Sequence, residues 1–253
     1  RADSKLGQRQ DAERSLQVEE AGPEEGPRLR GDMCENSPIG GWGLRRRGWQ
    51  RESFDGRGPT DRPFFQPVSL DPRQAKLLIS LAHRRGIDTS TIVDPFCGTG
   101  GIAIEAALQG LEVLASDLDP RMVQGTLENL KWAGTSASVE ISGASDIASL
   151  WGSKSNCAFV FDPPYGRSSW KSDDGAKLFL EALSAARDID PNGSVSIMLP
   201  TTPEAVEIDP NQDAEVMGMP WSDLEVLIRG CGLVPVLSSA VKVHGSLARR
   251  GVV

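Results

Sequence analysis

The chain has 253 residues, a net charge of −8 and an isoelectric point of about 4.9, and this length allows one good hydrophobic core, with or without an appendage. An acidic chain lacks the overall basic charge that is typical of nucleic-acid-binding proteins. No apolar run reaches membrane-spanning length and no signal-peptide pattern opens the chain, so the sequence argues against a membrane-spanning or secreted protein.

Residues 1–60 lack sustained periodicity and are rich in Gly, Pro, Glu and Arg. We therefore predict an irregular, disordered N-terminal segment over residues 1–60 and one folded domain over residues 61–253. An arginine cluster with interleaved tryptophans lies where the N-terminal segment meets the predicted domain. It consists of Trp42, Arg45, Arg46, Arg47, Trp49, Arg51, Arg57 and Arg62. Arginine beside tryptophan can hold phosphates and stack on bases, but a solvated linker is an equally good interpretation.

Strands and helices are predicted to alternate from about residue 62 onward. The expected helices run from Pro72 to near Gly86 and over residues 102–108, 120–133, 175–187 and 221–229. The expected strands cover residues 91–94, 112–116, 139–142, 158–162 and 194–199, with a final pair over 234–244 and 249–253. This alternation predicts an α/β fold with a doubly wound, mainly parallel sheet, whose ligands bind at the carboxyl ends of the strands.

A glycine-rich turn joins the first predicted strand to the next helix, in the segment Asp94-Pro95-Phe96-Cys97-Gly98-Thr99-Gly100-Gly101. Gly98 and Gly100 let the backbone turn tightly and approach a ligand. Asp117 ends the following strand, about 20 residues on, where a dinucleotide-binding fingerprint places an acid for ribose hydroxyls. This spacing fits NAD and S-adenosylmethionine equally well, because both carry an adenosine. A tight turn without any ligand is the simpler alternative.

Two features favour the methyl donor over NAD. The Asp94 carboxylate would repel a pyrophosphate, whereas it suits a sulfonium and an ammonium group. The Asp-Pro-Pro-Tyr element at residues 162–165 has no role in hydride transfer. The residues predicted to bind the cofactor are Asp94, Pro95, Gly98, Thr99, Gly100, Asp117, Leu118, Asp146 and Ile147. Asp146 could accept from the adenine amino group with Ile147 against the ring, although an Asp in a turn or helix cap is nearly as good an interpretation.

Asp162-Pro163-Pro164-Tyr165-Gly166 follows the apolar run 157–161 directly. Pro163 and Pro164 have no backbone N–H, so the strand must stop at Asp162. The Asp162 carboxylate and the Pro163 carbonyl could accept the two hydrogens of an exocyclic NH2, and Asp162 would stabilise positive charge developing on nitrogen. Tyr165 can stack on a planar base that is flipped out or unpaired. An ordinary strand-to-turn exit is the simpler alternative.

The two motifs together resemble the archaeal tRNA guanine-10 N2-methyltransferases and their eukaryotic relatives. Residues 62–73, which begin Arg-Pro-Phe-Phe-Gln-Pro, resemble the family's entry segment over the methyl-donor site, and residues 243–250 resemble its closing His-x-Ser-Leu-x-Arg segment. The resemblance implies a Rossmann-like class I methyltransferase domain with a seven-stranded sheet and an antiparallel last strand. It implies methyl transfer from S-adenosylmethionine to guanine N2 in tRNA, with Asp162, Pro163, Pro164 and Tyr165 as catalytic residues.

The sequence departs from the family in two places. The family carries an N-terminal THUMP module that grips tRNA, and residues 1–60 are too short and irregular to form one. We therefore expect a truncated chain, or RNA binding by the arginine cluster or by a partner such as the small zinc-binding activator subunit of the eukaryotic members. Gly245 stands where the family usually has a basic residue.

Two other functions remain as alternatives to methylation of guanine N2 in tRNA. They are an adenine-N6 methyltransferase acting on DNA or RNA, and an inactive, partner-dependent cofactor-binding subunit.

The cysteines and histidines predict neither a metal site nor disulfides. The four cysteines lack Cys-x-x-Cys spacing, which favours a reducing, cytoplasmic setting. The two histidines, His83 and His244, lie too far apart in the sequence to suggest a histidine-based acid–base pair or a metal site.

Overall fold

The computed structural model describes residues 54–253 except residues 68, 84–87, 165–172, 203–212 and 245–246. All of the described residues belong to one structural unit, Phe54–Val253. Most of the predicted N-terminal segment, including Arg45, Arg46, Arg47 and Arg51, lies outside the described residues. The boundary at residue 60 therefore stays a prediction.

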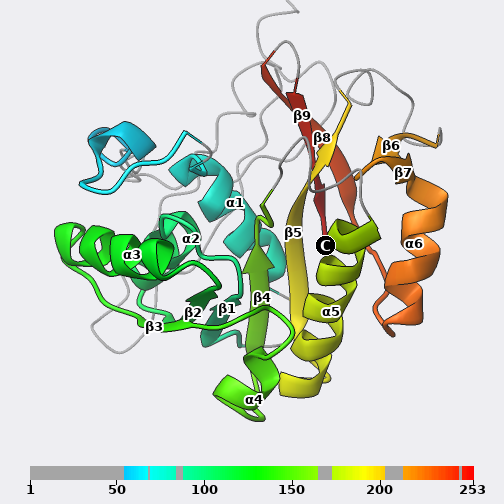
Figure 1. Ribbon diagram of the computed structural model, residues 1–253, viewed down its shortest axis with the longest axis horizontal. Coiled ribbons are helices and arrows are strands. Elements are labelled where there is room, and N and C mark those ends of the chain that lie inside the picture. Colours follow the sequence, from blue (N-terminus) through cyan, green and yellow to red (C-terminus); the bar gives the residue numbers. More distant parts are fainter. Residues whose placement is uncertain (1–53, 68, 84–87, 165–172, 203–212, 245–246) are drawn as a thin grey trace, which may run out of the picture. The chain divides into compact units, whose positions relative to one another are not determined.

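A mainly parallel sheet forms the centre of the unit (Figure 1). Its parallel strands are β1 (Thr91–Asp94), β2 (Glu112–Asp117), β3 (Ser138–Ile141), β4 (Cys157–Phe161) and β5 (Ser194–Thr201). They lie in the order β3-β2-β1-β4-β5. The last strand, β9 (Leu247–Val252), runs antiparallel beside β5, and β8 (Ser238–His244) pairs antiparallel with β9. These seven strands confirm the predicted sheet with its antiparallel last strand.

A short hairpin extends the sheet beyond the prediction. Its strands, β6 (Glu215–Val216) and β7 (Met219–Pro220), pair with each other, and β6 also pairs with the end of β5. The described part of the chain therefore forms a nine-stranded sheet. Strands of two residues carry no alternating pattern, so sequence periodicity could not reveal them.

The helices are α1 (Pro72–Ala82), α2 (Gly101–Ala107), α3 (Pro120–Trp132), α4 (Ile147–Trp151), α5 (Asp173–Ile189) and α6 (Trp221–Gly230), with a 3-10 turn, η1 (Pro59–Asp61). Asp71 and Asp119 cap α1 and α3, because each carboxylate accepts from the backbone N–H two residues on, and a proline follows each cap. The predicted bounds of α2, α3 and α6 agree with the structure to within one residue. Helix α4 was not predicted, because five residues are too few to show a helical period.

The core has two parts, one on each face of the sheet. One cluster joins α1, α2 and α3 to Ile92 and Val160, whereas the other joins α4, α5 and α6 to Val93 and Phe161. Neighbouring strand residues such as Ile92 and Val93 point to opposite faces and are both fully buried. Burial on both faces is typical of a parallel sheet covered by helices, and it leaves the strand ends as the place for a site.

Candidate functional site

Three aspartates lie at the carboxyl ends of three adjacent strands. Asp117 ends β2, Asp94 ends β1, and Asp162 follows the last residue of β4. The strand order places β1 between β2 and β4, with Asp94 opposite Ala115 and Val93 opposite Phe159. The three carboxylates therefore gather at one edge of the sheet, the edge at which open α/β sheets bind ligands.

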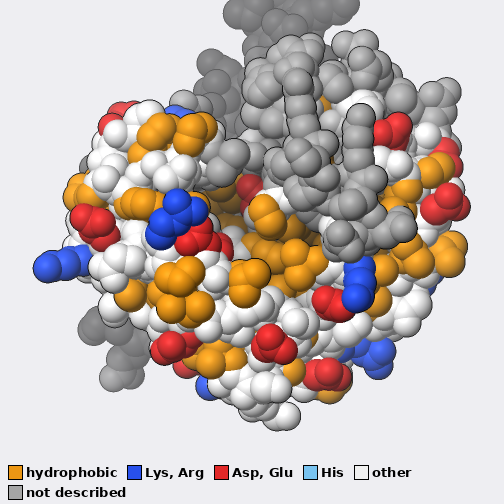
Figure 2. Space-filling view, viewed as in Figure 1, with side chains coloured by type: hydrophobic (Ala, Val, Ile, Leu, Met, Phe, Trp, Pro, Cys, Tyr) orange, Lys and Arg blue, Asp and Glu red, His pale blue; other side chains and the backbone are white. Residues whose placement is uncertain are grey.

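A cavity of about 530 Å³ opens at this edge, a volume within the usual range for small-molecule sites. In the space-filling view, apolar side chains gather in a hollow near the centre of the face (Figure 2). Both predicted motifs line the cavity. The predicted site residues that line it are Asp94, Pro95, Gly98, Thr99, Asp117, Leu118, Asp162, Pro163 and Pro164. The structure thus brings the glycine-rich turn and the Asp-Pro-Pro segment into one site.

The other predicted site residues lie elsewhere. Gly100 is buried and does not line the cavity, and Tyr165 lies outside the described residues. Ile147 is fully buried in the core, and Asp146 is an exposed residue at the N-cap of α4. In this stretch of the chain, Gly143 and Ala144 line the cavity instead.

Sequence reasoning did not assign a role to several other lining residues. They are Gln66, Ser69, Leu70, Phe96, Cys97, Gly101, Ile102, Asp119, Met122 and Leu178. Gln66, Ser69 and Leu70 belong to the segment that resembles the family's entry segment, so the resemblance was the signal that could have found them. Met122 and Leu178 lie on helices, where an apolar side chain that lines a site has the same pattern as one in the core.

Asp117 organises the glycine-rich turn. Its Oδ2 accepts from the Gly98 N–H at 3.0 Å and its Oδ1 accepts from the Asp119 N–H at 2.9 Å. Two backbone donors therefore hold the carboxylate in one orientation. Each carboxylate oxygen keeps a further lone pair, so Asp117 can still accept from hydroxyl groups of a ligand in the cavity.

The Asp94 carboxyl is almost completely buried, with 1% of its surface exposed, and its Oδ1 accepts from the Phe96 N–H at 3.1 Å. Burial raises the pKa of Asp94 well above its usual range, and the nearby Asp117 and Asp162 raise it further. Asp119 also lines the cavity, and none of the described lining residues is Lys or Arg. A cationic ligand would supply the missing positive charge.

The backbone at Gly100 requires glycine. Its φ of +80° is left-handed, and a Cβ at this position would lie 2.9 Å from Thr126 Cγ2. We expect Gly100→Ala to lower the free energy of unfolding by about 2 kcal/mol, from backbone strain and overpacking together. Thermal denaturation would measure this.

Gly134 provides a matched control, because it has a φ of +69° and no atom within 4 Å of a built Cβ. Gly134→Ala should therefore show the backbone penalty alone, about 1 kcal/mol. Equal losses for the two variants would contradict a packing role for Gly100.

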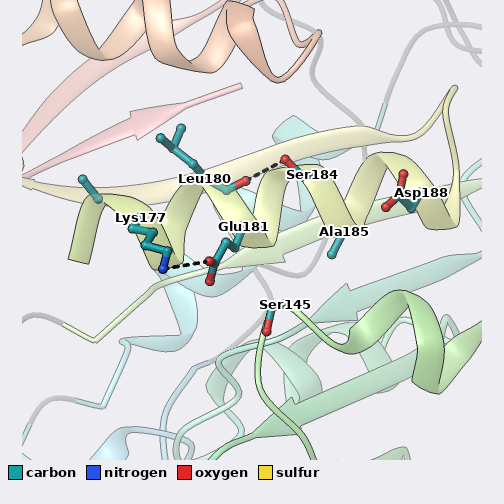
Figure 3. A pocket seen from close by; sticks show the side chains of 8 residues that line it. Ser145, Lys177, Leu180, Glu181, Ser184, Ala185 and Asp188 are labelled. Carbon is teal, nitrogen blue, oxygen red and sulfur yellow. Dashed lines mark hydrogen bonds and ion pairs between the residues drawn. The ribbon is translucent and has the colours of Figure 1, made fainter. Parts of the chain in front are cut away.

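A second, more open cavity of about 580 Å³ lies along α5 (Figure 3). Most of its lining comes from one helix, with Ser145 opposite, and its charged groups are an exposed Lys177–Glu181 ion pair and Asp188. It contains none of the strand-end aspartates.

In the part of the chain that the structure describes, no group of three or more His, Cys, Asp or Glu side chains could hold a metal ion.

Two arginines of the predicted cluster contact the domain. Arg62 is 4% exposed, and Arg57, whose side chain is 23% exposed, has its Nη2 3.6 Å from Oε2 of the buried Glu105. The burial of Arg62 makes it poorly placed for phosphate contacts, and the charge of Arg57 is partly used by Glu105. No helix among the described residues is long and apolar enough to cross a bilayer.

Comparison with known proteins identifies the domain. Residues 59–218 match the RMKL-like methyltransferase domain. The chain belongs to this methyltransferase family. A solved S-adenosylmethionine-dependent methyltransferase from Clostridium acetobutylicum has the same fold, with a TM-score of 0.54 at 11% identity over 73% of this chain and 92% of that one.

Named relatives of this methyltransferase domain modify tRNA. This chain is 42% identical over 137 residues to the tRNA (guanine(10)-N2)-dimethyltransferase of Methanothermobacter thermautotrophicus, and the match covers 54% of this chain and 40% of that protein. It is 33% identical over 177 residues to the Pyrococcus abyssi protein of the same name, covering 70% and 52%. The human tRNA (guanine(10)-N(2))-methyltransferase is 28% identical over 137 residues, covering 46% and 29%. The chain spans about half the length of these relatives or less.

Proposed function

We propose that this chain transfers a methyl group from S-adenosylmethionine to the exocyclic N2 amine of a guanine in tRNA, at position 10. The observation that carries the proposal is that Asp162 and Pro163 line the same cavity as the glycine-rich turn and Asp117. Membership of a methyltransferase family and the names of the relatives support it.

The cavity residues fit the parts of the methyl donor in the order of the strands. Asp117, at the end of β2, accepts from the ribose hydroxyls, and Leu118 packs against the adenosine. Gly143 and Ala144, near the end of β3, would contact the adenine, and Asp146 would accept from its amino group. Asp94, at the end of β1, would hold the ammonium group of the amino-acid end. Asp162, which follows β4, would act beside the methyl group.

At the β4 end, the protein activates a poor nucleophile. The lone pair of an exocyclic amine is delocalised into the base, so the nitrogen must be drawn toward tetrahedral geometry before it can attack. The Asp162 carboxylate and the Pro163 carbonyl accept hydrogen bonds from its two hydrogens, and Asp162 stabilises the charge that develops on nitrogen. Once the N–CH3 bond has formed, the nitrogen loses one of these hydrogens as a proton, with the Asp162 carboxylate as its acceptor. Tyr165 stacks on the base and fixes its approach. Bound S-adenosylmethionine supplies an electrophilic methyl group with a neutral thioether as leaving group.

An assay of the isolated chain with tRNA transcripts and labelled S-adenosylmethionine tests the function, with nucleoside analysis of the product. We expect N2-methylguanosine or its dimethylated form, and loss of the product when guanine 10 is replaced. N6-methyladenine in DNA or RNA would instead support the adenine-N6 alternative.

We propose that RNA contacts come from outside the acidic cavity, from Arg45, Arg46, Arg47 and Arg51 or from a partner subunit in the cytoplasm. A small zinc-binding activator subunit is one such partner. Full activity of the isolated chain would contradict dependence on a partner.

A further inference from the structure

Asn129 of α3 ties together two segments of the chain that are distant in sequence. One is the glycine-rich turn, and the other is the entry segment, residues 62–73, of which residue 68 lies outside the described residues. Asn129 is completely buried. Its Oδ1 accepts from the Phe64 N–H at 2.9 Å, and its Nδ2 donates to the carbonyls of Phe64 at 2.8 Å and Thr99 at 2.9 Å. Both amide hydrogens and the amide oxygen are thus used.

Two further contacts hold the entry segment against the same elements. The Phe64 ring lies directly on Gly125 of α3, so closely that a Cβ at Gly125 would overlap it. The Thr99 hydroxyl donates to Ser69 Oγ at 2.9 Å, and the Ser69 hydroxyl donates to the Gln66 carbonyl at 2.7 Å. The entry segment is therefore docked at Phe64 and again at Ser69.

This docking places the entry segment beside the glycine-rich turn, at one end of the cavity. The entry segment contributes Gln66, Ser69 and Leu70 beside Thr99, near the end of β1. The other end lies at Gly143 and Ala144, which follow β3, two strands away from β1. The proposed function assigns the first end to the amino-acid part of the cofactor and the second end to the adenosine.

We propose that Asn129 is a positioning residue that docks the entry segment onto the glycine-rich turn. In this way it sets how much the amino-acid end of the cofactor contributes to binding affinity. This inference rests on the proposed function. A buried amide whose partners are two backbone carbonyls and one N–H cannot be replaced by an apolar side chain without leaving those groups unpaired. Loss of the amide should therefore release the entry segment.

The test compares two ligands that differ only in the amino-acid end. S-adenosylhomocysteine carries this end, whereas 5′-methylthioadenosine lacks it. We expect Asn129→Ala to weaken binding of S-adenosylhomocysteine by about tenfold or more, as measured by isothermal titration calorimetry, the size expected for one or two lost hydrogen bonds. Binding of 5′-methylthioadenosine should change by less than about twofold.

Leu130→Ala is the matched control. Leu130 is the neighbouring residue on α3, it is 2% exposed, and its apolar side chain packs in the core and cannot make the hydrogen bonds of Asn129. This variant should lower thermal stability while keeping the affinities of both ligands at their wild-type values. Hydrogen exchange gives an independent reading, because Asn129→Ala should speed exchange in residues 62–70 and Leu130→Ala should not.

Gly125→Ala disturbs the docking of Phe64 on α3 while leaving Asn129 unchanged. The added methyl pushes Phe64 away from α3, while alanine favours the helix itself, so the variant is expected to fold and to show the same ligand-selective loss. Equal loss for both ligands, or unchanged binding of S-adenosylhomocysteine in both variants, would overturn the proposal. A wild-type chain that binds neither ligand would contradict the proposed function instead, and the exchange measurement would still decide whether Asn129 holds the entry segment.

Discussion

Asp162→Ala is expected to lower the rate of methyl transfer by about a hundredfold to a thousandfold, the usual size of losing a group that stabilises developing charge. Asp162 follows β4 directly and lines the cavity with Pro163. Removing its carboxylate leaves the base amine with the Pro163 carbonyl as its one remaining acceptor and the developing positive charge without a counter-charge. Cofactor affinity should change little, because Asp117 and Asp94 contact the donor in the proposed arrangement. Single-turnover rates and calorimetric binding of S-adenosylhomocysteine measure the two effects separately.

Asp190 is the matched control for this variant. It lies at the opposite end of β4, where its Oδ2 accepts from the Cys157 N–H at 3.0 Å, and it is 5% exposed. Asp190→Ala should therefore lower stability without a specific effect on the transfer step. Normal turnover in Asp162→Ala would contradict the mechanism. Loss of cofactor binding equal to the loss of rate would instead make Asp162 a cofactor ligand.

Asp94→Asn is expected to maintain or raise the stability of the cofactor-free protein and to lower its affinity for S-adenosylmethionine. The amide keeps the acceptor for the Phe96 N–H but never carries a buried negative charge. The free protein should therefore be at least as stable as wild type at neutral pH, because an unpaired buried carboxylate is costly. Affinity for S-adenosylmethionine should fall by tenfold or more, since a charge-assisted contact of about 1.5 to 3 kcal/mol is lost.

The pH dependence of stability follows from the same carboxyl. Its pKa in the folded protein is raised above the ordinary value of 3.8, so the folded state keeps a proton that the unfolded state has lost. The contribution of Asp94 to stability therefore decreases as pH rises from about 4 through the raised pKa. Subtracting the Asp94→Asn profile from the wild-type profile of melting temperature isolates this contribution. A difference that does not change between pH 4 and 8 would contradict a raised pKa.

The affinity for the cofactor should depend on pH in the opposite direction to stability. A cationic ligand favours the ionised carboxylate, so wild-type affinity for S-adenosylmethionine should rise with pH over the same window as the bound proton is released. The neutral product, S-adenosylhomocysteine, lacks the sulfonium and should show a weaker rise. Asp94→Asn should remove most of the dependence for both ligands, and calorimetry in buffers of different ionisation enthalpy would detect the released proton.

Local sequence patterns were sufficient for the longer elements, though not for α4, β6 and β7, and for the positions of the two motifs. The caps Asp71 and Asp119, each followed by proline, mark the starts of α1 and α3. Pro163 and Pro164 end β4 because they lack a backbone N–H. These features depend on residues that are neighbours in the sequence, and for that reason periodicity and capping chemistry could predict them.

Only the tertiary structure decided which of these pieces meet. The strand order β2-β1-β4 brings Asp117, Asp94 and Asp162 into one cavity, and packing against α3 makes Asn129 a partner of both Phe64 and Thr99. The pattern around Ile147 suited a ligand contact equally well, yet the side chain is in the core. Strand order and buried contacts follow from long-range packing of two helical layers on one sheet, and no local pattern in the sequence encodes them.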